Sequence, residues 1–168
     1  VMGVSGVGKS TVAVALAAEL GVECGEGDDL HPAANVALMA AGAPLTDDDR
    51  RVWLDAVGRW LAAHDGAGGV ISRSALKRSY RDSLRAAAPR ATFAHLVADH
   101  ETVLARMHGR DHFMPASMLD SQEVILEPLQ SDESGWTIES KGTPSPIIEA
   151  LVRDIRRGDE SVTRDNLQ

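Results

Sequence analysis

The chain has 168 residues, which suits one domain, and its 43% hydrophobic and 25% charged residues are ordinary for a globular protein. The formal net charge of −8 argues against nucleic acid or an anionic membrane surface as a partner, because both favour a basic face. A single cysteine, Cys24, excludes an internal disulfide and fits a reducing compartment such as the cytoplasm. No apolar run approaches the length that a membrane span requires.

The first motif stands almost at the start, where residues 3–10 read GVSGVGKS and match the phosphate-binding pattern G-x-x-x-x-G-K-[S/T]. Glycine lets backbone N–H groups approach a polyphosphate without an intervening Cβ, and the following helix adds the positive end of its dipole. Lys9 can reach the terminal phosphates, and the Ser10 hydroxyl can bind Mg²⁺. The predicted nucleotide-binding residues are Gly3, Ser5, Gly6, Val7, Gly8, Lys9, Ser10 and Thr11.

The context of this loop favours a nucleotide site over the alternative, a glycine-rich turn into an ordinary helix. Val12, Leu16 and Leu20 recur at helical spacing directly after the motif. Only Val1 and Met2 precede it, although such a loop normally follows a buried strand of about five residues. We therefore expect the protein to begin before the first residue given.

Beyond the loop, helical and short apolar segments alternate, which is typical of an α/β fold with a mainly parallel sheet. Thr46 and Asp49 fit a helix N-cap and its capping-box acid, and Trp53 is expected in the core. Strands are predicted near residues 21–27, 70–71, 92–97 and 136–138, and helices over 35–41, 47–61, 74–87, 100–106, 115–126 and 146–156. The sequence thus predicts one domain over 1–157 and a polar, flexible tail over 158–168.

A phosphate loop alone does not separate kinases from other nucleotide-binding proteins. The chain lacks the N-K-x-D stretch of guanine-specific proteins and is too short for an oligomeric ATPase module, which leaves a small phosphotransferase. Asp28 falls where the second strand should end, so its carboxylate could accept the proton of an acceptor hydroxyl; the alternative is a turn aspartate that caps the next helix. Residues 106–112 could cover the triphosphate with cationic side chains, or form a solvated loop.

Five motifs, in this order and over nearly the whole chain, resemble the gluconate kinases, a family of small P-loop kinases. They are GVSGVGKS at 3–10; GDDLHP at 27–32 with Asn35, Met39 and Gly42; PL at 44–45 with DDR at 48–50 and Trp53-Leu54; SALK at 74–77 with Tyr80-Arg81-Asp82 and Leu84-Arg85; and HFMP at 112–115 with Ser121-Gln122. The resemblance implies a three-layer P-loop kinase fold, in which helices flank a five-stranded parallel sheet and a mobile lid spans about 106–117. It also implies a homodimer in the cytoplasm.

The same resemblance implies transfer of the γ-phosphoryl group of ATP to the 6-hydroxyl of D-gluconate, with Mg²⁺ bound through Ser10. Lys9 and Asp28 are then the catalytic residues, and Arg106 and Arg110 of the lid contact the nucleotide. The residues that it implies for binding the sugar acid are Asp28, His31, Arg50, Lys77, Arg81, His112 and Gln122.

Some of these residues have structural alternatives. Lys77 and Arg81 would also fit a solvated helix face, Arg50 could pair with acids of its own first turn, and His31 could satisfy the following helix. The chain departs from the family at Asp111, which stands in the lid where glycine is usual. Two other functions therefore stay open: a kinase for another small hydroxylated acid such as shikimate, and a non-catalytic nucleotide-binding module that acts through a partner.

Overall fold

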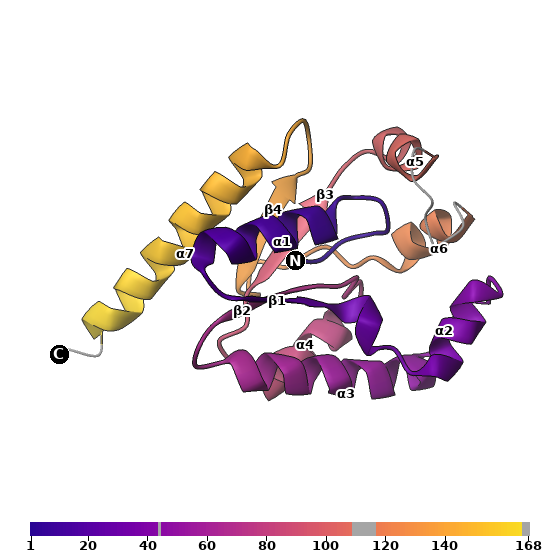
Figure 1. Ribbon diagram of the computed structural model, residues 1–168, viewed down its shortest axis with the longest axis horizontal. Helices are drawn as coiled ribbons and strands as arrows, with labels where there is room; N and C mark the ends of the chain where they lie inside the picture. Colours follow the sequence, from indigo (N-terminus) through magenta and orange to yellow (C-terminus); the bar gives the residue numbers. More distant parts are fainter. Residues whose placement is uncertain (44, 109–116, 166–168) are drawn as a thin grey trace.

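The computed structural model describes residues 1–43, 45–108 and 117–165 (Figure 1). Within these residues the strands are β1 (Glu23–Glu26), β2 (Gly69–Ser72), β3 (Phe93–Val97) and β4 (Gly135–Glu139). The helices are α1 (Lys9–Leu20), α2 (Ala33–Ala40), α3 (Asp47–His64), α4 (Arg78–Ala87), α5 (His100–His108), α6 (Ser117–Ile125) and α7 (Ser145–Asp165), with a 3₁₀ turn, η1 (Gly27–Leu30), after β1. Among the described helices, none combines the length and the apolar character that crossing a membrane requires.

The strands form two parallel pairs, β1 with β2 and β3 with β4, and residues 1–3 lie between the pairs. The Val1 amino group donates to the Ile71 carbonyl on one side at 2.8 Å. On the other side, Met2 forms an isolated parallel bridge to His95. The spatial order is therefore β1, β2, residues 1–3, β3 and β4. In place of the five predicted strands, the described residues form four strands and one bridge, and residues 1–3 occupy the middle position through backbone hydrogen bonds on both sides.

Helices cover both faces of these strands. Figure 1 shows α1 and α7 on one face and α3 and α4 on the opposite face. The first face has a core that includes Val12, Leu16 and Leu151, and the second has a core that includes Trp53 and Leu84. Burial of apolar side chains on both faces stabilises the three-layer α/β arrangement that the sequence predicted.

The structure confirms one predicted helix boundary and corrects two. The Thr46 hydroxyl accepts a hydrogen bond from the Asp49 N–H, and the Asp49 carboxylate accepts one from the Thr46 N–H, so the predicted capping box begins α3. Helix α4 begins at Arg78 rather than at residue 74, after a loop in which Ala75 has a φ of 45°. Helix α7 extends to Asp165, past residue 157, because no proline follows Pro146 to interrupt the propagating helix.

Candidate active site

The phosphate loop lies at the N-terminus of α1, as its motif predicted. Gly8 has a φ of 106° and caps the helix in the left-handed region, which glycine adopts at little cost. Gly6 has a φ of 78°, and a Cβ there would lie 2.6 Å from Cγ of Met107 in α5. Side chains at these positions would therefore distort the loop that presents its N–H groups at the head of α1.

Lys9 folds back over the loop, where its Nζ donates to the Val4 carbonyl at 2.9 Å. Burial lowers the pKa of Lys9, and the carboxylates of Asp28 and Glu26 oppose that shift. The two predicted catalytic residues, Lys9 and Asp28, are thus close enough to interact electrostatically. Their contacts with phosphate and with an acceptor hydroxyl stay predictions.

A short chain of polar groups connects the first helix to the end of β1. The Ser10 and Ser72 hydroxyl oxygens lie 3.3 Å apart, and the Ser72 hydroxyl donates to a Glu26 carboxylate oxygen at 2.7 Å. A hydroxyl with a carboxylate nearby is the hard oxygen donor set that Mg²⁺ prefers, so these residues fit that ion. Sequence reasoning missed Glu26, although an acid at the end of a parallel strand, two residues before Asp28, was a signal that could have found it.

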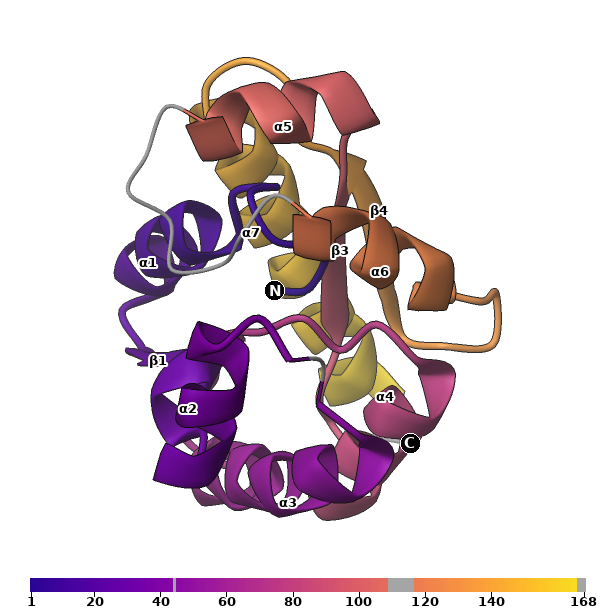
Figure 2. The ribbon, with the colours of Figure 1, turned by 90° about the vertical axis from the view of Figure 1, so that its right-hand side faces the viewer.

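A pocket adjoins the phosphate loop. Figure 2 looks onto this end of the molecule, where α2 and α3 lie on one side of the loop and α5 and α6 on the other. The residues that line the pocket come from η1, α2, α3, the β2–α4 loop, α4 and α6, and include residue 45 before α3: Asp28, His31, Met39, Leu45, Arg50, Trp53, Ser74, Leu76, Tyr80, Ser121, Gln122 and Ile125. Four of the predicted sugar-acid residues, Asp28, His31, Arg50 and Gln122, therefore meet around one pocket.

Gln122 contacts the phosphate loop as well as the pocket. Its Oε1 accepts a hydrogen bond from the Ser5 backbone N–H at 2.7 Å, and its Nε2 lies 3.4 Å from the Ser5 hydroxyl oxygen. Helix α6 thereby reaches across to the loop that precedes α1. The pocket and the predicted triphosphate site share this side chain.

His31 forms part of an aromatic wall of the pocket. Its imidazole stacks on the Trp53 indole, with 4.5 Å between ring centroids and 6° between planes. Burial, helped by the nearby Arg50 charge, lowers the pKa of His31 to about 4. The imidazole is therefore neutral near pH 7, which makes it a hydrogen-bond partner for hydroxyls rather than a cation for a carboxylate.

Two of the predicted cations share one acid at the start of α3. Asp47 accepts from Lys77 Nζ at 2.9 Å, from the Tyr80 hydroxyl at 2.5 Å and from Arg50 at 3.4 Å. Hydrogen bonds from Tyr80 and then Lys77 lower the pKa of Asp47 to about 2, so it is ionised at neutral pH. Arg50 thus pairs with its own first turn, the alternative left open by the sequence, and also lines the pocket. Lys77 lies beside Tyr80 but is not among the lining residues.

Arg81 requires a correction, because the structure does not bring its side chain to the pocket. The side chain is fully buried and forms a two-point ion pair with Glu133, with Nε–Oε1 and Nη2–Oε2 distances of 2.7 Å. Its Nη1 also donates to the Ala75 and Leu76 carbonyls at 3.3 Å. The side chain is therefore not on a solvated face and does not line the pocket, and its hydrogen bonds hold the β2–α4 loop, whose Ser74 and Leu76 do line it.

The described part of the predicted lid contacts the phosphate loop. Arg106, in the last turn of α5, donates to the Val7 carbonyl at 3.1 Å and to the Ser140 hydroxyl and carbonyl oxygens at 3.0 and 2.8 Å. Ser140, at the end of β4, is a contact that sequence reasoning missed. Arg110, Asp111 and His112 lie outside the described residues, so their predicted roles stay predictions.

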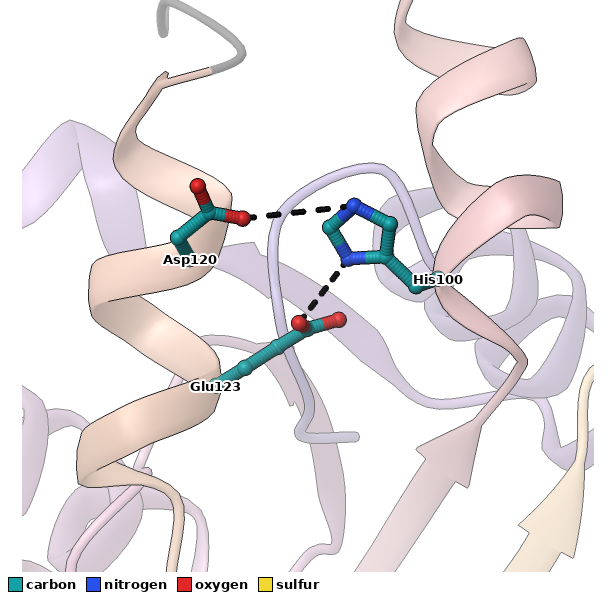
Figure 3. Close-up of side chains that lie close together, drawn as sticks. All are labelled: His100, Asp120 and Glu123. Carbon is teal, nitrogen blue, oxygen red and sulfur yellow. Dashed lines mark hydrogen bonds and ion pairs between the residues drawn. The ribbon is translucent and has the colours of Figure 1, made fainter.

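A second polar cluster joins the two helices on either side of the predicted lid. His100 at the start of α5 faces Asp120 and Glu123 of α6, and each of its ring nitrogens points toward one of the two acids, as Figure 3 shows. Its Nδ1 is 2.9 Å from a Glu123 oxygen, and its Nε2 is 3.9 Å from an Asp120 oxygen. The hydrogen bond to Glu123 raises the pKa of His100. These exposed groups form an ion-paired connection between α5 and α6.

Known proteins resemble this chain over nearly its whole length. A gluconokinase of Gluconobacter oxydans (strain 621H) is 44% identical over 162 residues, which span 95% of this chain and 91% of that protein. The chain belongs to the gluconokinase family. The crystal structure of a gluconokinase from Sinorhizobium meliloti 1021 is 40% identical and superposes with a TM-score of 0.88, covering 98% of this chain and 94% of that one.

Membership in the gluconokinase family confirms the resemblance drawn from the five motifs and the predicted P-loop kinase fold. The thermosensitive gluconokinase of Escherichia coli (strain K12) is also 44% identical over 135 residues, which span 79% of this chain and 72% of that protein. No family model matches the chain. The pocket beside the phosphate loop is therefore the candidate active site of a gluconokinase-family enzyme.

Proposed function

We propose that the protein transfers the γ-phosphoryl group of ATP to the 6-hydroxyl of D-gluconate, which gives 6-phospho-D-gluconate and ADP. The main observation behind this proposal is that one side chain connects the two sites. Gln122 contacts the phosphate loop and also lines the pocket. An acceptor bound in that pocket would then lie next to the terminal phosphate of a nucleotide bound on the loop. The gluconokinase relatives supply the identity of the acceptor.

The candidate active site contains residues that suit each step of this reaction. The N–H groups at the head of α1 and the Lys9 ammonium bind the phosphates, and Asp28 accepts the proton of the 6-hydroxyl as the new O–P bond forms. The bond from the γ-phosphorus to the oxygen of ADP breaks, and ADP carries that electron pair away. Arg106, which donates a hydrogen bond to the Val7 carbonyl of the loop, is proposed to contact the nucleotide.

Mg²⁺ belongs to the proposal as a cofactor. Ser10 would hold it, with Ser72 and Glu26 behind, and the ion would offset negative charge on the phosphate oxygens. We also propose that the enzyme works in the cytoplasm, in keeping with its single cysteine, and without nucleic acid or a membrane as partner, in keeping with its net charge of −8. The resemblance to the gluconate kinases is the basis for proposing a homodimer.

An ADP-release assay with ATP, Mg²⁺ and a panel of acceptors tests this function. We expect turnover that depends on D-gluconate and little turnover with shikimate. Faster turnover with shikimate would assign a different acceptor. ATP binding without turnover on any acceptor would instead indicate a non-catalytic nucleotide-binding module.

A further inference from the structure

One buried cation beside the pocket, Arg73, forms no hydrogen bond or ion pair with an acid among the described residues. Arg73 follows β2 directly, and only 3% of its surface is exposed. Within the described part of the chain, none of its three guanidinium nitrogens has a hydrogen-bond partner. A buried charge without compensation is costly, so a fold that keeps one needs a reason outside its own stability.

Three other cations near the pocket have acid partners. Arg50 and Lys77 share the Asp47 carboxylate, and Arg81 is paired with Glu133. Burial, and then the charge of Arg81, lower the pKa of Arg73 to about 9, so it still carries its charge near pH 7. Of these four cations, Arg73 is the one whose guanidinium nitrogens have no hydrogen-bond partner in the described part of the chain.

Arg73 lies directly behind the aromatic wall of the pocket. Its guanidinium carbon is 5.3 Å from the centroid of the Trp53 ring, the same side chain on which His31 stacks. Trp53, His31 and the next residue along the chain, Ser74, all line the pocket. Because the Trp53 side chain, and not bulk water, separates this charge from the pocket, the electrostatic field of the charge is screened less than it would be in water.

We propose that Arg73 is a specificity residue, whose buried positive charge behind Trp53 selects an acceptor with a carboxylate over a neutral polyol of the same length. The proposal rests on the proposed function, because it concerns the acceptor of that reaction. Arg73 acts through the pocket wall and is therefore a positioning residue, not a catalytic one. Arg50, Lys77 and Arg81, which were predicted to bind the carboxylate of the sugar acid, have acid partners. Arg73 has none among the described residues.

The test compares gluconate with D-glucitol, which carries a neutral CH₂OH in place of the carboxylate. Discrimination is measured as the inhibition constant of D-glucitol divided by the KM for gluconate. In Arg73→Met we expect discrimination to fall roughly tenfold or more, through a higher KM for gluconate, while the KM for ATP changes less than about twofold. Arg73→Lys keeps the charge and should retain discrimination within about threefold.

Two further readouts separate electrostatics from packing. Loss of an uncompensated buried charge should leave the thermal midpoint of Arg73→Met unchanged or raise it, whereas a structural role would lower it. Arg90→Met also removes one positive charge, but Arg90 pairs with Asp65 at the far end of α3 and should leave discrimination unchanged. Should Arg73→Met not fold, Arg73→Gln offers the same loss of charge with hydrogen-bonding capacity retained.

Unchanged discrimination in the charge-removing variants would overturn the proposal, as would an equal weakening of gluconate and D-glucitol binding. Wild-type turnover on gluconate separates these outcomes from failure of the proposed function. If the wild-type enzyme turns over gluconate and Arg73→Met discriminates as well as it does, only the assignment of Arg73 is wrong.

Discussion

Arg81 and Glu133 form a two-point ion pair that is closed off from solvent, with both N–O distances at 2.7 Å and no exposed surface on either side chain. The pair joins α4 to the segment before β4 and leaves the remaining guanidinium donor for the carbonyls of the β2–α4 loop. One wall of the candidate active site therefore depends on a contact that faces away from it.

Breaking this pair should unfold the protein more readily. We expect Arg81→Met to lower the free energy of unfolding by roughly 3 kcal/mol, because it removes the two-point partner of the buried Glu133 and leaves that carboxylate with Arg85 at 3.0 Å. Urea denaturation followed by circular dichroism measures the change. The exposed pair of Arg78 and Asp132 is the matched control, and Arg78→Met should have a much smaller effect. A small effect of Arg81→Met would contradict the buried pair.

Asp28→Asn should lower kcat at least about a hundredfold while ATP binding stays nearly intact, because the amide cannot accept the hydroxyl proton. Steady-state ADP release gives kcat, and titration calorimetry gives the ATP dissociation constant. The adjacent Asp29→Asn is the matched control, since Asp29 is exposed and is not a lining residue of the pocket. Near-normal turnover of Asp28→Asn would remove this residue from the role of base.

Glu26→Gln should raise the Mg²⁺ concentration for half-maximal activity about 10-fold or more, because it removes the charge behind the Ser10 and Ser72 hydroxyls. Activity is measured over a range of free Mg²⁺ at saturating ATP. Glu23→Gln removes the same charge from the start of β1, where the carboxylate contacts His64 instead. Equal responses of the two variants would place Glu26 outside the metal site.

The pair of His100 and Glu123 should stabilise the fold at low pH and lose that effect as pH rises. Since the folded pKa of His100 lies above its ordinary value of 6.5, protonated His100 favours the folded state below pH 6.5. This contribution disappears as pH rises through the folded pKa. Asp120, Glu101 and Glu123 act on His100 in the same direction. Glu123→Gln should therefore lower the thermal midpoint at about pH 6 more than at about pH 9.

Differences between variants at each pH isolate this pair from other titrating groups. His31 acts in the opposite direction, because its pKa of about 4 in the fold makes the protein less stable as pH falls from 6.5. His100→Gln removes the titrating group itself and should abolish the pH dependence of the Glu123→Gln effect. A Glu123→Gln effect that grows with pH would contradict the assigned sign.

Local motifs made the phosphate loop and the α3 cap predictable, because a few adjacent residues determine both. The partner of Arg81 could not be found in this way. Its helical spacing fits a solvated face as well as a pocket, and Glu133 lies 52 residues away along the chain. The difference between a substrate cation and a buried structural cation is decided by tertiary packing, which the spacing within α4 does not contain.

Glu26 and Arg73 were missed for a related reason. Their positions become meaningful only when β1 pairs with β2, which brings Glu26 opposite Ser72. The gluconokinase motif at residues 74–77 begins directly after Arg73, so the motif does not include this residue. The pairing of β1 with β2 thus positions both charged groups near the candidate active site. Each of these strands has four residues, and the sequence predicted β1 only weakly.

Gln122 contacts both parts of the candidate active site, the phosphate loop and the pocket beside it. The Ser5 amide that it occupies belongs to the loop that is proposed to receive phosphate, and its other side faces the pocket. If ATP binding moved this side chain and so changed the affinity for the sugar acid, thermodynamic reciprocity would require the sugar acid to change the affinity for ATP by the same factor.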